Sequence, residues 1–235
     1  MQIKPYGDQA LIVEFENKID VAISNQVITM YHALKGIKGI KYLIPAYHTL
    51  TIGLNRDKTE TNFIYKEIER FKQSNQSQKN ELSETLTIPV CYEPPFDLDT
   101  KEVEQITGLT KKEIVSIHIR QSYQVFMLGF LAGFAYMGEV DQRLHCPRKM
   151  NPRKEVPMGA VGIAGAQTGI YPIQAPGGWQ IIGRTPLPLF DPSSAQPARL
   201  KPGLKVRFRA ISLDEFKLIE LKLSEDLYRL ELKGA

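Results

Sequence analysis

The sequence predicts an α+β protein with two parts, a small α/β domain over residues 1–80 and a β-barrel domain over residues 85–235. Residues 2–71 alternate short strand patterns with amphipathic helical patterns. Residues 73–85 are polar and almost free of apolar side chains, as expected of a linker. Residues 156–192 combine frequent glycine and proline with short apolar runs, which excludes helices and favours tightly turned strands.

The elements of the first domain follow from strand alternation and helix caps. Residues 2–16 predict two strands joined by a turn at residues 6–9. Asp20 offers an N-cap oxygen for a helix that Gly36 ends, because glycine accepts the left-handed backbone that follows a helix. The other elements expected here are a hairpin at residues 40–45 and 50–54 and an amphipathic helix capped by Thr59 or Thr61.

Regular elements flank the glycine-rich region of the second domain. A strand at residues 85–91 precedes a helix that begins at Asp99 or Thr100 and ends at Gly108. Thr110 then caps another helix, with a glutamate at the capping-box position. The remaining expected elements are strands at residues 123–128 and 205–211, a helix at residues 214–223, and a segment at residues 226–233 that suits either strand or helix.

Composition excludes several classes of function. The net charge is +4 and the basic residues are scattered, so we expect no nucleic-acid partner. The chain shows no signal peptide and no apolar run long enough to span a bilayer, so we expect a cytoplasmic protein without a membrane partner. Cys91 and Cys146 are expected as reduced thiols. There is no phosphate-binding loop and no metal-ligand spacing, so no metal ligand is assigned.

Arginines form the most specific candidate site. Arg148 and Arg153 each follow a proline, which fixes the backbone before them. Two rigidly presented guanidinium groups could grip one carboxylate or phosphoryl group, and a solvated basic loop is the alternative. Arg184 follows two apolar residues and needs an anionic or carbonyl partner, for which we expect Asp191.

Polar side chains within the glycine-rich region form a second candidate group. Gln167, Thr168 and Tyr171 lie beside Gly169 and shortly after Gly165. Together with the backbone amides, they suit the recognition of a small polar ligand by hydrogen bonds. A turn followed by a strand, with its polar groups satisfied internally, is the alternative.

Histidines and aromatic residues supply further candidates. His118 and His145 could each move a proton. A helix C-terminal cap is the alternative for His118. In residues 132–138 small residues alternate with aromatic ones, including Phe134, which suits either core packing or a flat wall against a ligand.

Three motifs carry a resemblance to a known family. They are GFLAGFAYMG at residues 129–138, CPRKMNPRKEVPMGAVGIAGAQTGIYP at residues 146–172, and PGGWQIIGRTPLPLFDP at residues 176–192. The segments PYGDQALIVEF near the start and PGLKVRF near the end add to it. Over essentially the whole chain they resemble the KipI / allophanate hydrolase subunit 1 family, and within it the bacterial 5-oxoprolinase B subunits. The chain departs from that family at three places, which affects loop detail: Ala132 where proline is frequent, residues 93–96 where a glycine-rich turn is expected, and Ala160 where serine is frequent.

The resemblance implies a cyclophilin-like barrel after the small α/β domain. It implies a chain that acts with 5-oxoprolinase subunits A and C to hydrolyse 5-oxo-L-proline to L-glutamate. ATP with magnesium is then the cofactor, with contacts shared with the partner subunits. From residue type and the motif match together, we predict His118, Arg148, Arg153 and Arg184 as catalytic residues. The predicted substrate-binding residues are Gly165, Gln167, Thr168, Gly169 and Tyr171.

Two other functions are open within the same family. Some members bind and inhibit a sporulation histidine kinase, for which Pro95, Phe96 and Phe134 would be the anchors in this chain. Homologous segments also form part of urea carboxylases, which implies a component of a carboxylase or hydrolase that metabolises urea or allophanate. The residues alone do not separate 5-oxoproline from substrates derived from urea.

Overall fold

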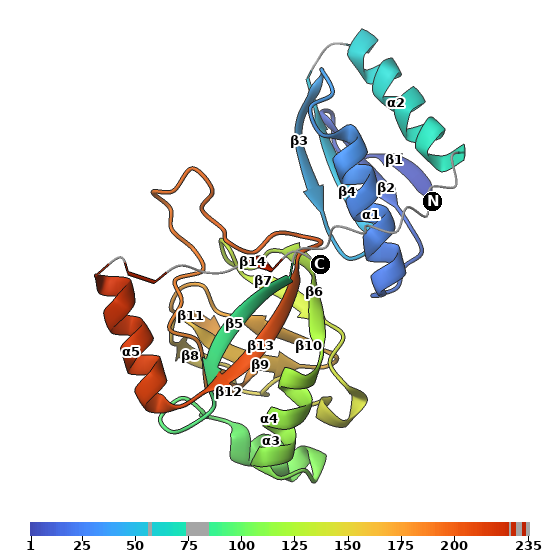
Figure 1. The fold of residues 1–235 in the computed structure, drawn as a ribbon. Coiled ribbons are helices and arrows are strands. Elements are labelled where there is room, and N and C mark those ends of the chain that lie inside the picture. Colours follow the sequence, from blue (N-terminus) through green and yellow to red (C-terminus); the bar gives the residue numbers. More distant parts are fainter. Residues whose placement is uncertain (56–57, 74–84, 226, 229–231, 234–235) are drawn as a thin grey trace. The chain divides into compact units, whose positions relative to one another are not determined.

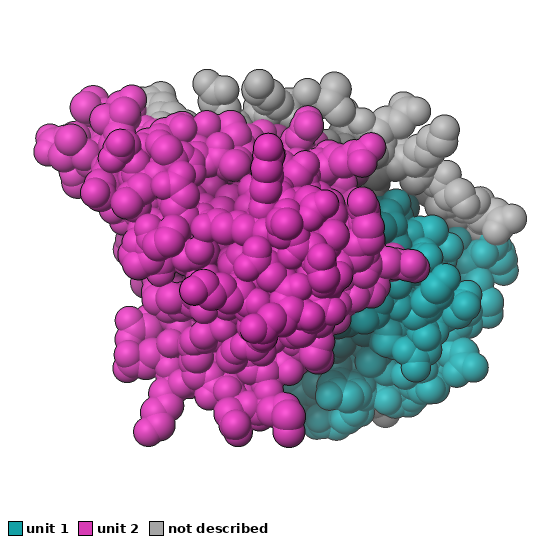
Figure 2. All heavy atoms as spheres, turned by 90° about the horizontal axis from the view of Figure 1, so that it is seen from below, with its two compact units in different colours: residues 1–81 teal, residues 82–235 magenta. Residues whose placement is uncertain are grey.

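The structure is a computed structural model in two compact units, Met1–Glu81 and Leu82–Ala235, which Figure 2 colours separately. The predicted linker at residues 73–85 lies almost entirely outside the described residues. The residues that the structure describes are 1–55, 58–73, 85–225, 227–228 and 232–233 (Figure 1).

Unit 1 contains an antiparallel sheet with the strand order β1-β2-β4-β3, and α1 packs against β3 and β4. The elements confirm the predicted strand–turn–strand, the hairpin and the two helices, although β4 begins one residue earlier than expected. Their bounds are β1 Gln2–Pro5, β2 Ala10–Glu14, α1 Val21–Leu34, β3 Ile40–Pro45, β4 Thr49–Leu54 and α2 Lys58–Gln73. The expected cap at Thr59 or Thr61 is wrong, because α2 already begins at Lys58.

The start of α1 shows why this sequence forms a helix there. Asp20 is extended, and its Oδ1 accepts hydrogen bonds from the backbone N–H of Ala22 at 2.7 Å and of Ile23 at 3.2 Å. These bonds satisfy two donors that the first helical turn leaves unpaired. Val27 on the inner face of α1 and Leu50 on β4 are fully buried, so the cap directs an apolar face into the core of unit 1.

Unit 2 contains a closed barrel of seven strands within the described part of the chain. The strand order is β12-β9-β10-β7-β6-β13-β5, and β12 pairs back with β5 at Arg184 and Cys91, which closes the ring. The pair β5–β13 is parallel and the others are antiparallel. The bounds are β5 Thr85–Cys91, β6 Ser122–Leu128, β7 Ala135–Gly138, β9 Ala160–Ala164, β10 Gln167–Ile170, β12 Gln180–Arg184 and β13 Lys205–Ile211.

Helices, one two-stranded sheet and one further short strand complete the described part of unit 2. Gly108 ends α3 with a left-handed φ of 72°, and Thr110 opens α4 with the predicted capping box, in which Thr110 N donates to Glu113 Oε2 at 2.8 Å. The segment at residues 226–233 is described only in part and ends in a strand that pairs with β5. The bounds are α3 Thr100–Thr107, α4 Lys111–Arg120, η1 Gln142–Leu144, β8 Arg153–Val156, β11 Ala175–Gly177, α5 Leu213–Ser224 and β14 Leu232–Lys233.

The apolar side chains of unit 2 form two separate clusters on opposite faces of the barrel wall. Side chains alternate between the faces of a strand. Ala135 and Met137 of β7 accordingly join the large cluster inside the barrel, whereas Phe134 and Tyr136 belong to a smaller cluster on its outer face. The predicted barrel is therefore confirmed, and part of its outer face is itself apolar. No helix in the described residues is long and apolar enough to cross a bilayer.

Candidate functional site

Two glycines on neighbouring strands give the outer face a flat area. Gly162 of β9 lies opposite Gly169 of β10. A Cβ atom on Gly169 would lie 3.0 Å from the rings of both Phe134 and Trp179, and a Cβ atom on Gly162 would lie 3.1 Å from the Cβ of Trp179. Glycine at these two positions therefore lets the aromatic rings lie directly against the sheet.

Four side chains, Phe134, Tyr136, Tyr171 and Trp179, form what we call the aromatic cluster. The ring centroid of Phe134 lies 4.9 Å from Tyr136, 5.1 Å from Tyr171 and 5.3 Å from Trp179, always edge to face. Phe134 is fully buried at its centre, so the expectation that Phe134 anchors a kinase at the surface is wrong. A Cβ atom on Gly177 would lie 2.1 Å from Tyr171 Oη, so this glycine also makes room for the cluster.

Arg148 brings a positive charge to the edge of the aromatic cluster. Its side chain is exposed, and Tyr136 is the half-buried member of the cluster. Burial raises the pKa of both Tyr136 and Tyr171, and the charge of Arg148 opposes that rise in each case. Arg148 has no hydrogen bond or ion pair with any residue that the structure describes. A free guanidinium beside a phenol and an apolar wall is suited to a small organic anion.

The loop that carries Arg148 is held by a buried carboxylate. The Asp99 side chain is only 2% exposed. Its oxygens accept hydrogen bonds from Arg153 Nη1 at 2.6 Å, from Lys149 Nζ at 2.9 Å and from Ile181 N at 2.7 Å. Burial raises the pKa of Asp99, but the bonds from Arg153, Ile181 and Lys149 outweigh burial and leave the pKa below its ordinary value. Asp99 thereby joins the 149–153 loop to β12.

Glu102 and Gln180 extend this network. Lys149 Nζ also pairs with Glu102 Oε2, and Gln180 Nε2 donates to Glu102 Oε1 at 2.9 Å. The amide orientation of Gln180 follows from this bond and from a second one to the carbonyl of Pro147 at 3.4 Å. Gln180 Oε1 is buried without a hydrogen-bond donor among the described residues, which carries the desolvation cost of an unpaired acceptor.

His118 lies inside the barrel, away from the aromatic cluster. Its Nδ1 is 2.8 Å from Tyr92 Oη and its Nε2 is 2.9 Å from Thr168 Oγ1, while Thr168 donates to the carbonyl of Gly162. The network thus assigns the proton to Nε2 and makes Nδ1 an acceptor. Burial lowers the pKa of His118 to about 3, so the ring is neutral at physiological pH. His118 and Thr168 pack within the barrel, where the structure gives them no surface from which to contact a substrate.

The structure separates the two arginines that follow prolines. Arg153 directs both terminal nitrogens at Asp99, so its guanidinium is engaged within the fold. Of the two, only Arg148 is free to bind an anion. We expected Arg148 and Arg153 to bind one anion together. The observed geometry differs, because the Arg153 guanidinium is already paired with Asp99.

Arg184 lies at the end of β12 with different partners. Its Nε donates to the carbonyl of Met158 at 2.8 Å, and its guanidinium lies 5.4 Å from the ring centre of Phe96. The expected pair between Arg184 and Asp191 is wrong. Asp191 instead accepts hydrogen bonds from the backbone and side chain of Ser193.

The other predicted residues have identifiable positions. Gln167 lies two residues before Gly169 on β10, so the two residues share the outer face of the barrel with the aromatic cluster. Gly165 turns the chain between β9 and β10 with a φ of 57°, and its N–H donates to the carbonyl of Cys146 at 2.7 Å. His145 directly follows η1, and its Nε2 lies 3.2 Å from the carbonyl oxygen of Val140.

Potential metal ligands and thiols are the last candidate groups. Within the described ranges, no three His, Cys, Asp or Glu side chains are placed together to hold a metal ion. Cys91 and Cys146 are both buried free thiols, and burial raises the pKa of Cys146 to about 12. Cys146 is therefore a packing residue rather than a nucleophile.

The network around Asp99 was not predicted from the sequence. The pattern assigned Asp99 or Thr100 to the cap of α3. Asp99 is at the cap position, but its side chain makes no capping hydrogen bond. Its side-chain partners Lys149 and Arg153 lie 50 and 54 residues away in the sequence, and Gln180 lies 78 residues from Glu102. The one local signal was an aspartate followed by Thr100, which is itself a good cap and leaves the carboxylate available for other bonds.

Comparison with known proteins agrees with the resemblance. Residues 1–200 match the family described as the carboxyltransferase domain, subdomain C and D. The B subunit of the 5-oxoprolinase of Bacillus subtilis is 36% identical over 227 residues, which cover 92% of this chain and 95% of that protein. The corresponding B subunit of Escherichia coli O157:H7 is 35% identical over 202 residues, which cover 86% of this chain and 92% of that protein.

Solved structures share the fold. The crystal structure of TTHA0988 superposes with a TM-score of 0.76 and 30% identity, and the match covers 87% of this chain but only 40% of the longer TTHA0988 chain. The Kluyveromyces lactis urea carboxylase gives a TM-score of 0.73 at 17% identity, over 99% of this chain and 24% of that one, which supports the fold alone. This chain therefore belongs to the family of carboxyltransferase C and D subdomains that includes the bacterial 5-oxoprolinase B subunits.

Proposed function

We propose that this chain is the B subunit of an ATP-dependent 5-oxoprolinase, which acts with the A and C subunits to open 5-oxo-L-proline to L-glutamate. The observation that carries the proposal is the match to two bacterial proteins of that name along almost their whole length. In the net reaction water adds across the lactam C–N bond, and ATP is hydrolysed to ADP and phosphate. The lactam amide is stabilised by resonance, so its opening needs this coupling.

The aromatic cluster and Arg148 supply what such a substrate requires from this chain. The free guanidinium binds the carboxylate of 5-oxoproline, and the half-buried Tyr136 offers an apolar face to its ring. Gln167 lies on the same face, where its amide can hydrogen-bond the lactam. Binding and orientation of the substrate are therefore the proposed tasks of this chain.

The nucleotide and the phosphoryl transfer are assigned mainly to the partner subunits. This assignment rests on the sequence, which shows no phosphate-binding loop, although its guanidinium groups suit contacts with phosphoryl oxygens. The chemistry that bound ATP supplies is activation of the lactam oxygen, which makes the ring carbonyl a better electrophile. The proposed location is the cytoplasm, where the free thiols of Cys91 and Cys146 stay reduced.

Reconstitution tests the proposal. The A, B and C subunits are purified separately and mixed with ATP, magnesium and 5-oxo-L-proline, and glutamate and phosphate are measured. We expect glutamate formation with all three subunits and its loss when this chain is omitted. Restoration by adding the chain back is the matched control.

A parallel reaction with urea in place of 5-oxo-L-proline tests the competing function. We expect no phosphate release stimulated by urea. Glutamate formation that is the same without this chain, or ATP turnover that depends on urea, would contradict the proposed function.

A further inference from the structure

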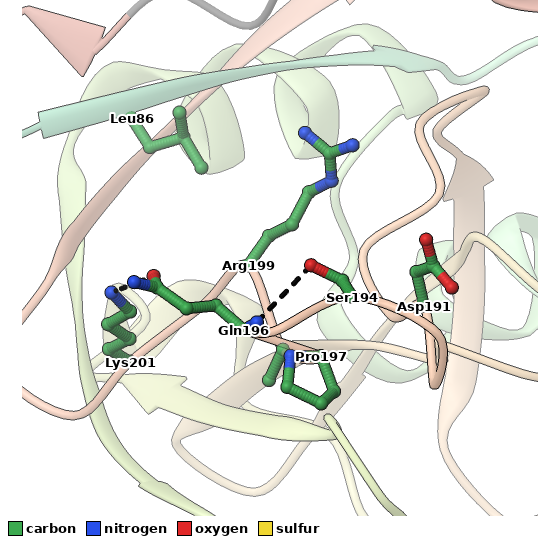
Figure 3. A pocket seen from close by; sticks show the side chains of 8 residues that line it. Leu86, Asp191, Ser194, Gln196, Pro197, Arg199 and Lys201 are labelled. Carbon is green, nitrogen blue, oxygen red and sulfur yellow. Dashed lines mark hydrogen bonds between the residues drawn. The ribbon is translucent and has the colours of Figure 1, made fainter.

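A pocket of about 340 Å³ lies in unit 2 between the segment that connects β12 and β13 and Leu86 of β5 (Figure 3). It shares no residue with the aromatic cluster or Arg148. Its volume is at the lower end of the range for small-molecule sites. It is lined by Leu86, Asp191, Ser194, Gln196, Pro197, Ala198, Arg199 and Lys201.

The cations of this pocket outnumber its carboxylates among the described lining residues. Hydrogen bonds from Ser193 and, to a smaller extent, the charge of Arg199 lower the pKa of the Asp191 carboxyl. Arg199 has no hydrogen bond or ion pair from its side chain to any described residue. Lys201 Nζ donates to the neutral amide oxygen of Gln196 at 2.8 Å. The Asp191 carboxylate accepts from Ser193 N at 2.9 Å and from its Oγ at 2.6 Å. The lining therefore presents two positive charges against one carboxylate, which is already hydrogen-bonded.

Backbone hydrogen bonds hold these side chains in place. Asp191 N donates to the carbonyl of Pro197 at 2.8 Å, and Arg199 N donates to the carbonyl of Leu189 at 3.0 Å. Leu189 and Leu200, at the two ends of the segment that carries these residues, are both buried and anchor it to the core. The pocket is thus formed by a fixed backbone frame rather than by exposed side chains alone.

We propose that this pocket binds a small anion with a carboxylate or phosphate group. The Arg199 guanidinium provides a planar fork for two oxygens, and Lys201 adds a point charge. The hydroxyl of Ser194, which accepts from Gln196 N at 3.2 Å, keeps its own proton available for a third bond. Arg199, Ser194 and Lys201 all line the pocket, and in Figure 3 the Lys201 side chain is directed at Gln196.

Binding to the isolated full chain tests this site separately from the proposed function. Titration calorimetry with inorganic phosphate and, in a second arm, with glutamate distinguishes the two anion chemistries. We expect millimolar or tighter binding of at least one probe, weakened by salt. In the Arg199→Ala variant we expect affinity to fall roughly tenfold or more, because a charge-assisted contact is lost.

Arg207→Ala is the matched control, since Arg207 is an exposed arginine on β13 outside the pocket. It should bind as the wild type does, and both variants should keep the wild-type melting temperature. Binding of phosphate alone or glutamate alone supports the site and identifies its ligand class. Absence of binding to the wild type, or equal affinity in Arg199→Ala, would overturn the proposal.

Discussion

Replacement of Asp99 by alanine removes the residue that joins the Arg148 loop to the barrel. The variant loses the acceptors for Arg153, Lys149 and the N–H of Ile181 in one step. Asp99 also lies next to α3, whose residue Glu102 shares Lys149 with it. We therefore expect both lower stability and a less ordered loop.

The magnitude follows from how well water can replace the lost bonds. Removal of one partner from a fully buried ion pair costs about 3–5 kcal/mol. Here the side chains of Arg153 and Lys149 are 27% and 18% exposed and can regain water, and Lys149 keeps Glu102. The N–H of Ile181 stays buried and loses its partner, which alone costs about 1–3 kcal/mol. We expect a total loss of about 2–4 kcal/mol.

Urea unfolding at pH 7 measures this loss. Asp99→Asn should cost less than Asp99→Ala, because the amide oxygen still accepts from Ile181 N. Asp97→Ala is the control, since Asp97 pairs with a partly exposed Lys111 and should cost about 1 kcal/mol or less. If Asp99→Ala costs no more than Asp97→Ala, the assigned role of the buried carboxylate is wrong.

Two further perturbations test the interior and the outer face of the barrel. Because the pKa of His118 is about 3 when folded and about 6.5 when unfolded, only the unfolded state gains its proton between these values. Stability should therefore fall by about 1.6 kcal/mol from pH 6.5 to pH 5, and His118→Gln should flatten this part of the unfolding profile; an unchanged slope would contradict the buried neutral ring. Gly177→Ala should destabilise by about 1–3 kcal/mol in thermal unfolding, because its Cβ would lie 2.1 Å from Tyr171 Oη. Gly178→Ala, whose nearest atoms lie at 3.5 Å, should be close to neutral, and equal melting points for the two variants would refute this packing.

Local patterns predicted most of the fold because they depend on neighbouring residues. The Asp20 cap, the Thr110 capping box and the strand at Thr85–Cys91 each follow from chemistry within a few positions. The barrel was predicted from glycine and proline frequency, and Gly162 and Gly169 show its physical basis, since aromatic rings occupy the space of their missing side chains.

The candidate site was harder to predict because it depends on long-range pairing. Sequence alone made Arg148 and Arg153 equivalent, and only the position of Asp99 separates the engaged guanidinium from the free one. The burial of His118 is consistent with the spacing of the apolar residues in its helix. Ile114, Ile117 and His118 share one face of α4, and all three are buried.

Arg148 is the group to which we assign the substrate carboxylate, and the proposed role of this chain depends on it. The decisive measurement is the kcat/KM for 5-oxo-L-proline of the reconstituted three-subunit enzyme with wild-type chain, Arg148→Ala or Lys154→Ala, where Lys154 is a neighbouring exposed cation on β8. We predict a loss of about 10- to 100-fold for Arg148→Ala and little change for Lys154→Ala. Equal kcat/KM values for Arg148→Ala and the wild type would contradict this role of Arg148.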